Sequence, residues 1–212
     1  MKVIAGFLSL YLAVCAFPAL AADGIVRTGV KQSHFSAKPV ALRLRSGAVL
    51  VLAQDSGEPL FAKNVDHVMP IASITKLMTA MVVLDSGLPL LESIDIDDRD
   101  IDRKKGSRSK LQVGTTLMRA EMLKLALMAS ENRAAAALAR NFPGGTEAFV
   151  AAMNQKAAEL GMVNSRFEDP TGLAPNNVST AADLARMVVA AHTYPLIREY
   201  TTSDSFKIES ED

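Results

Sequence analysis

The fold can be worked out from residues 70–79, which read PIASITKLMT. Within and after this stretch, apolar residues recur at the spacing of one helix face: Ile74, Leu77, Met78, Met81 and Val82. A recurrence every three to four residues predicts an amphipathic helix, and Gly87 marks its end. The only charged residue in the stretch is Lys76, one helical turn after Ser73, so both side chains lie on the same side of the helix.

Ser73 and Lys76 can act together as a nucleophile and its base. A serine hydroxyl is a weak nucleophile until a neighbouring base removes its proton. At the start of a helix, the backbone N–H of Ser73 would also be free to face an oxyanion. Apolar neighbours such as Ile71 and Leu77 would lower the pKa of Lys76 by desolvation. Taken alone, the pair is better explained as a capping serine and an exposed lysine, because Ser-x-x-Lys occurs by chance in many chains.

Residues 130–132, Ser-Glu-Asn, follow a second helical pattern and supply two further polar groups. The hydroxyl of Ser130 can pass a proton between Lys76 and a leaving amine. The side-chain amide of Asn132 can bind both the lysine and a substrate carbonyl. By themselves, these residues also fit the ordinary end of a helix.

The two motifs together resemble those of penicillin-binding proteins and class A β-lactamases. Residues 70–79, 125–132 (LALMASEN) and 167–173 (FEDPTGL) are similar to the low-molecular-mass D-alanyl-D-alanine carboxypeptidases. Residues 105–109 (KGSRS) are most similar to the D-alanyl-D-alanine endopeptidase branch, the penicillin-binding protein 7 group. The resemblance extends over roughly residues 40 to 205 and is specific because the motifs occur in combination.

The resemblance implies an α/β (α+β) fold of the β-lactamase/DD-peptidase type, with a helical lobe and an antiparallel sheet. It implies that Ser73 is the acylated serine, Lys76 the general base, Ser130 the proton shuttle and Asn132 the substrate-binding amide. The implied substrate is a peptidoglycan peptide with a D-Ala-D-Ala or D-Ala–diaminopimelate bond, and β-lactams would acylate the same serine as inhibitors. The turn at residues 169–172 is expected to be structural.

The sheet is expected to begin with a β-hairpin and then to lack its later strands. Residues 48–53 and 59–63 read as two strands joined by a turn at residues 55–58. The family carries a Lys-Thr-Gly motif on a later strand, and this sequence contains none. We therefore expect residues 46–212 to form an incomplete, truncated domain. Catalysis should be impaired in this form, because losing one oxyanion donor typically costs about 100- to 1,000-fold in rate.

Helical patterns dominate the chain after the hairpin. Thr146 and Thr180 are expected to cap two of the helices. Residues 92–110 are rich in charge, with five aspartates followed by a basic run. This segment lacks the glycine and closing glutamate of an EF-hand, so a solvated loop is expected there and not a calcium site.

The N-terminus predicts export. A positive start, a short apolar run and Ala19-Leu20-Ala21 indicate a signal peptide over residues 1–21, followed by a lead-in segment at 22–45. We therefore expect a periplasmic protein with no transmembrane segment in the mature chain. The only cysteine, Cys15, lies in the signal, so the mature protein has neither disulfide nor thiol nucleophile. A lipid anchor at Cys15 is the alternative interpretation.

Composition excludes several other functions. The formal net charge is +0 and there is no tryptophan, which argues against binding to nucleic acid. The three histidines have no ligand-like spacing, so neither a metal nor another cofactor is expected.

Two alternatives to a DD-peptidase remain open. A class A-like β-lactamase would use the same two motifs with a glutamate that activates water, and Glu168 is the candidate. The second alternative is a truncated, non-catalytic peptidoglycan-binding protein, which the missing Lys-Thr-Gly favours and the intact serine and lysine disfavour.

Overall fold

The structure is a computed structural model in which residues 44–103 and 105–207 are described. These residues belong to one compact unit that begins at Leu44. The predicted signal peptide, Cys15 and nearly all of the lead-in segment lie outside the described residues. Among the described residues, none of the helices combines the length and the apolar character that crossing a membrane requires.

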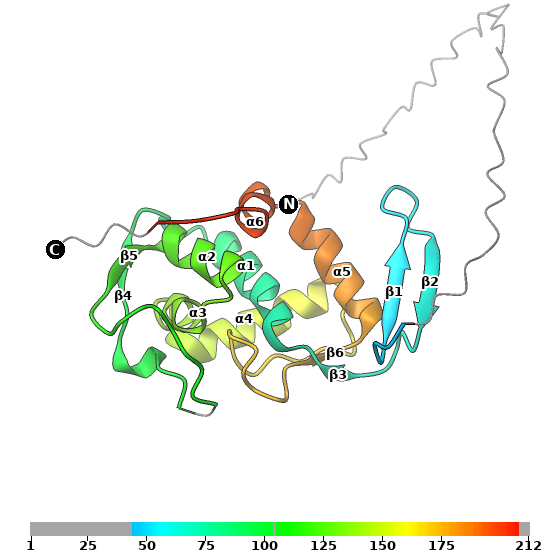
Figure 1. Ribbon diagram of the computed structural model, residues 1–212, viewed down its shortest axis with the longest axis horizontal. Helices are drawn as coiled ribbons and strands as arrows, with labels where there is room; N and C mark the ends of the chain where they lie inside the picture. Colours follow the sequence, from blue (N-terminus) through cyan, green and yellow to red (C-terminus); the bar gives the residue numbers. More distant parts are fainter. Residues whose placement is uncertain (1–43, 104, 208–212) are drawn as a thin grey trace, which may run out of the picture. The chain divides into compact units, whose positions relative to one another are not determined.

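Helix α1 (Thr75–Asp85) is the centre of the helical part and contacts every other helix of the group (Figure 1). Because it has neighbours on several sides, it is buried over most of its surface and not along a single stripe. Ile74 is the exception to the predicted face: it is 44% exposed and belongs to the short 3-10 turn η1 (Ala72–Ile74). The surrounding helices are α2 (Arg119–Met128), α3 (Asn132–Arg140), α4 (Gly145–Glu159), α5 (Ala181–His192) and α6 (Pro195–Thr201).

Three antiparallel strand pairs accompany the helices. The predicted hairpin is confirmed as β1 (Val49–Leu52) paired with β2 (Pro59–Lys63). The other two pairs were not predicted, since strands of two or three residues are too short for an alternating pattern. They are β3 (Met69–Pro70) with β6 (Val178–Ser179), and β4 (Ser93–Asp95) with β5 (Thr116–Met118).

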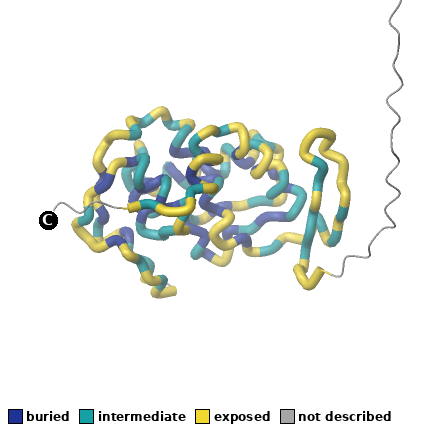
Figure 2. The backbone as a smooth tube through the Cα atoms, turned by 45° about the horizontal axis from the view of Figure 1, so that its top comes forward, coloured by how far each residue is buried: buried dark blue, intermediate teal, exposed yellow. Residues whose placement is uncertain are grey.

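Neither strand of the hairpin contains a buried residue (Figure 2). Its β1 strand contacts α5, but Leu60 is 65% exposed and Val51 is 41% exposed. Within the described residues the sheet holds only these two strands. The hydrophobic core therefore lies among the helices.

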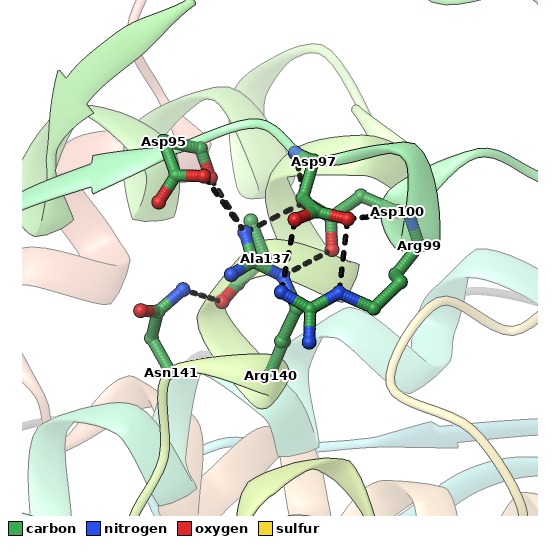
Figure 3. Close-up of polar contacts among 7 residues, drawn as sticks. All are labelled: Asp95, Asp97, Arg99, Asp100, Ala137, Arg140 and Asn141. Atoms are coloured by element: carbon green, nitrogen blue, oxygen red, sulfur yellow. Dashed lines mark hydrogen bonds and ion pairs between the residues drawn. The ribbon is translucent and has the colours of Figure 1, made fainter. Parts of the chain in front are cut away.

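The charged segment at residues 92–110 is only partly the solvated loop that was predicted. It contains β4 and the turn η2 (Asp98–Asp100), and Asp100 is only 4% exposed. Arg140, at the end of α3, donates to both carboxylate oxygens of Asp100, at 3.0 and 2.9 Å (Figure 3). This partner, 40 residues away in the sequence, makes burial of the carboxylate possible.

One predicted helix cap is confirmed and the other is wrong. Thr180 Oγ1 accepts a hydrogen bond from the backbone N–H of Asp183 at 3.1 Å, as expected for a cap of α5. Helix α4 instead begins at Gly145, with Gly144 in the left-handed region (φ 85°) as its N-cap. Thr146 therefore lies inside the first turn, because the glycine takes the tight bend that starts the helix.

Candidate active site

The amine of Lys76 is the centre of a polar cluster within the helical core. Lys76 is 3% exposed and its Nζ has four oxygen neighbours. It donates to Asn132 Oδ1 and to the Thr171 carbonyl oxygen, both at 2.7 Å, and lies 3.3 Å from the hydroxyls of Ser73 and Ser130. The four residues predicted from the two motifs are therefore brought together around one nitrogen.

Counting hydrogens shows what this cluster can do. In its neutral form Lys76 has two N–H donors, which the two short contacts to Asn132 and Thr171 can use. The nitrogen lone pair is then free to accept a hydrogen bond from the hydroxyl of Ser73 or of Ser130. The hydroxyl of Ser130 donates to Ser73 Oγ at 2.8 Å, so both hydroxyls and the amine form one connected path for a proton.

The backbone on both sides of the cluster is held in uncommon conformations. Ala72 and Ser130 have φ angles of 46° and 53°, which non-glycine residues seldom adopt. A Cβ on Gly172 would lie 2.0 Å from the Ala72 carbonyl oxygen, so only glycine allows this close approach. Such strain persists where the surrounding structure fixes it, and here it aims the two hydroxyls at Lys76.

The turn at residues 168–177 is tied to α1 by side-chain hydrogen bonds. Thr79 Oγ1 donates to the Pro170 carbonyl at 2.7 Å, and Asn177 Nδ2 donates to Thr75 Oγ1 at 3.1 Å. Inside the turn, Asp169 accepts from the backbone N–H groups of Thr171 and Gly172. These contacts place the Thr171 carbonyl oxygen against Lys76.

Burial changes the acidity of the lysine in the predicted direction. Desolvation lowers the pKa of Lys76 from 10.5 to about 8, while the carboxylates of Asp169 and Glu131 act in the opposite direction. A substantial fraction of the amine is therefore neutral near pH 8. A neutral amine beside a hydroxyl is what the activation of a serine requires.

Motif reasoning missed two members of the cluster. The turn at 169–172 was expected to be structural, yet the Thr171 carbonyl is a direct acceptor for Lys76. Ser107 was also not singled out, although its Oγ accepts from Asn132 Nδ2 at 3.0 Å. A backbone oxygen leaves no signal in residue type, and Ser107 is one of several serines in a charged segment. Only its position in the KGSRS stretch could have drawn attention to it.

A groove of about 810 Å³ begins beside the cluster. Asn132 and Thr171 line one part of it, and residues 98–103, with Arg140, line another. Within the described residues, no group of histidine, cysteine, aspartate or glutamate side chains could hold a metal ion. The polar groups at the cluster are thus a nucleophilic hydroxyl, a low-pKa amine and an amide beside an open groove.

Glu168 does not join this cluster. Its Oε2 accepts from Asn176 Nδ2 at 3.0 Å, and its Oε1 lies 3.5 Å from Arg166. The carboxylate is therefore engaged with groups other than Ser73 and Lys76. This position does not support the water-activating role that a β-lactamase would need.

The cluster has the serine–lysine arrangement that acyl transfer requires, and comparison with known proteins gives the family. The family model described as D-alanyl-D-alanine carboxypeptidase, peptidase S11, matches residues 33–211. This chain belongs to that family, and the resemblance seen in its motifs is confirmed.

Curated relatives include D-alanyl-D-alanine endopeptidases of two bacteria. The chain is 54% identical to the Pseudomonas aeruginosa protein over 165 residues, which cover 78% of this chain and 53% of that protein. It is 43% identical to the Escherichia coli protein over 196 residues, covering 92% and 60%. The chain thus spans between half and two thirds of the length of these relatives. The prediction that residues 46–212 form an incomplete domain stays a prediction.

Solved structures confirm the predicted α+β, DD-peptidase-like fold. An evolved penicillin-binding protein homologue from Mycobacterium tuberculosis matches with a TM-score of 0.70 and 29% identity, over 78% of this chain and 63% of that one. A mutant of the Streptomyces K15 DD-transpeptidase matches with a TM-score of 0.68 and 27% identity, over 73% and 64%.

Proposed function

We propose that this protein is a serine-type D-Ala-D-Ala carboxypeptidase/endopeptidase that acts on peptidoglycan peptides. The observation that supports this most directly is the position of the Lys76 amine, which contacts Ser73 and Ser130 and has a pKa lowered to about 8. No cofactor enters the reaction, and β-lactams acylate the same serine as inhibitors.

The reaction begins when the neutral Lys76 amine takes the proton of Ser73, directly or through Ser130. Ser73 Oγ then attacks the carbonyl carbon of the scissile bond, and the oxyanion faces the Ser73 backbone N–H, which stabilises it. The hydroxyl of Ser130 passes the proton to the leaving amine as the C–N bond breaks. Water then attacks the acyl-serine and releases the carboxylate product, which regenerates the Ser73 hydroxyl.

Asn132 binds the substrate while it holds the base. Its Oδ1 accepts from Lys76 Nζ, and its Nδ2 has a hydrogen that can be donated to a substrate carbonyl. The adjoining groove offers room for the peptide on the Asn132 and Thr171 side. Peptide substrates are thus held where the acyl carbon meets Ser73.

Cleavage of a cross-link is the more strongly supported form of the reaction. The relatives at 54% and 43% identity are both called D-alanyl-D-alanine endopeptidases, whereas a Bacillus subtilis relative at 34% is called a carboxypeptidase. Such an enzyme works on the cell wall and contributes to its biogenesis and to cell shape. The predicted signal peptide supports a periplasmic location.

Labelling with a fluorescent penicillin tests the proposal. The 212-residue chain should form a covalent adduct, and Ser73→Ala should abolish it because the nucleophile is gone. Ser109→Ala, a serine whose Oγ contacts only the Leu111 backbone among the described residues, is the matched control and should label normally. A folded wild-type chain that shows no Ser73-dependent adduct would favour the non-catalytic peptidoglycan-binding alternative.

Two further measurements separate the enzyme classes. Long-lived penicillin adducts indicate a DD-peptidase, whereas sustained penicillin hydrolysis would indicate the β-lactamase alternative. Incubation with cross-linked muropeptides and with a pentapeptide ending in D-Ala-D-Ala then shows which bond is cut. We expect the cross-linked substrate to be cleaved faster.

A further inference from the structure

Asn132 has a second hydrogen-bond partner that the proposed mechanism does not use. Its Oδ1 accepts from Lys76 Nζ at 2.7 Å, and its Nδ2 donates to Ser107 Oγ at 3.0 Å. Ser107 comes from a loop 25 residues earlier in the sequence and is half-buried. The amide is therefore held from both ends.

The two ends of an asparagine amide are similar in shape but opposite in charge. Protonated Lys76 offers only donors, so it is stabilised by Oδ1 and repelled by Nδ2. A rotation of the Asn132 amide by half a turn would exchange the two groups. Protonated Lys76 therefore selects the orientation in which Oδ1 faces it, and the hydrogen bond from Nδ2 to Ser107 Oγ holds the opposite end of the amide.

The loop that carries Ser107 is itself held in place. The carboxylate of Asp102 accepts from the backbone N–H of Lys105 at 3.0 Å and of Ser107 at 2.9 Å. Farther along, Arg133 on α3 donates to the Leu111 carbonyl at 2.6 Å. The loop is thus fastened before and after Ser107, and it presents a fixed acceptor to Asn132.

We propose that Ser107 is a positioning residue that holds the Asn132 amide in the orientation that Lys76 selects. One Nδ2 hydrogen is then used by Ser107, the second is left for a substrate carbonyl, and Oδ1 stays on Lys76. The catalytic consequence rests on the proposed function, whereas the orientation of the amide does not. The test therefore has one readout without catalysis and one with it.

The first readout is the pKa of Lys76, measured by NMR titration of its labelled side chain in the full 212-residue chain and assigned with Lys76→Arg. In Ser107→Ala the far end of the amide loses this contact and Oδ1 can move away from Lys76, so the pKa of Lys76 should fall below its wild-type value. Ser107→Thr, which keeps the hydroxyl, should restore it, and Ser109→Ala should not change it. The carboxylates that act on Lys76, Asp169 and Glu131, are the same in all these variants.

A pKa of Lys76 that is unchanged in Ser107→Ala would overturn the proposal. Because this readout needs no turnover, it decides the matter even if the wild-type chain is not acylated, an outcome that would count against the proposed function alone. Circular dichroism of each variant checks the fold, and Ser107 lies on a loop outside the hydrophobic core.

The second readout is the rate of acylation by fluorescent penicillin. Loss of one hydrogen bond at this amide should lower the acylation rate constant about tenfold in Ser107→Ala, and Ser107→Thr should recover most of it. If Ser107 acts through Asn132, the same substitution should cost nothing further in an Asn132→Ala background. A loss of equal size in both backgrounds would contradict the proposal.

Discussion

Two cations in the helical part of the molecule, Lys76 on α1 and Arg140 on α3, have opposite kinds of partner. Arg140, whose side chain is 14% exposed, binds the buried carboxylate of Asp100 through two nitrogens (Figure 3). The hydrogen bond to Asp100 raises the pKa of Arg140 above its ordinary value. Lys76 has four neutral oxygens as direct neighbours, and burial lowers its pKa to about 8.

The difference explains why the pKa values of the two cations are shifted in opposite directions. A carboxylate at hydrogen-bond distance compensates for lost hydration and keeps the cation charged. Hydroxyl, amide and carbonyl oxygens satisfy the hydrogens of Lys76 without supplying a full charge, so its proton can leave near neutral pH. The neutral partners of Lys76 therefore leave its pKa low, whereas Arg140 stays protonated with any partner and Asp100 compensates for its burial.

The largest effect is expected from Lys76→Arg, which makes the central cation as permanent as Arg140. A guanidinium stays protonated and cannot accept the Ser73 proton, so acylation by penicillin should fall about 1,000-fold. The measurement is the second-order rate constant of labelling, with Lys110→Arg on the exposed loop as control. Retention of more than a tenth of the wild-type rate would show that Lys76 is not the base.

Asp100→Asn removes the carboxylate partner of Arg140. It should lower the stability of the fold without changing the rate of acylation. Leaving Arg140 largely buried without a carboxylate partner should lower the free energy of unfolding by about 3 kcal/mol. Asp95→Asn is the matched control: its carboxylate is 59% exposed and 4.0 Å from Arg140, so the cost should be below about 1 kcal/mol. Chemical denaturation measures both, and acylation per folded molecule should stay at the wild-type rate.

Asn132→Asp gives Lys76 a carboxylate partner like the one that Arg140 has in Asp100. A charge at this distance should raise the pKa of Lys76 by roughly one to three pH units. The pH of half-maximal acylation should rise accordingly, and the rate at pH 7 should fall. Glu131→Gln removes a carboxylate that raises this pKa and should move the midpoint slightly the other way. Midpoints that move together in both variants would contradict this account.

The last prediction needs no substitution. Since the neutral amine is the active form, acylation should rise with pH, reach half its maximum at about 8, and fall about tenfold for each pH unit below that. The folded-state pKa is below the unfolded value of 10.5, so the unfolded chain binds more protons between about 8 and 10.5. The contribution of Lys76 to the free energy of unfolding should therefore increase with pH in this window. A flat rate profile between pH 6 and 9 would exclude Lys76 as the titrating group.

Much of the site could be predicted from the sequence because its side chains occur in two short motifs. Ser73 and Lys76 are one helical turn apart, so local geometry already brings them together. Ser130 and Asn132 were proposed from their side-chain chemistry and supported by family resemblance, and the structure brings them to the same nitrogen. Their catalytic roles remain predictions.

Contacts between distant segments could not be predicted in this way. The Thr171 carbonyl, 95 positions from Lys76, is a backbone atom that any residue type would supply. The burial of Asp100 depends on Arg140, and the short strand pairs carry no periodic signal. The predicted solvated loop was wrong at Asp100 for the same reason, since local composition does not reveal the partner across the fold. The predicted cap at Thr146 was wrong for a local reason, because Gly144 takes the tight bend that starts α4.

By itself, the sequence determined the family, the hairpin, the central helix and the residue types of a nucleophile and its base. These depend on local periodicity and on side-chain chemistry, which a linear chain already contains. Only the tertiary structure decided that Lys76 is buried among neutral oxygens, that Arg140 meets a carboxylate, and that Ser107 holds the Asn132 amide. Acidity and orientation depend on what surrounds a group in three dimensions, and that environment comes from segments far apart in the chain.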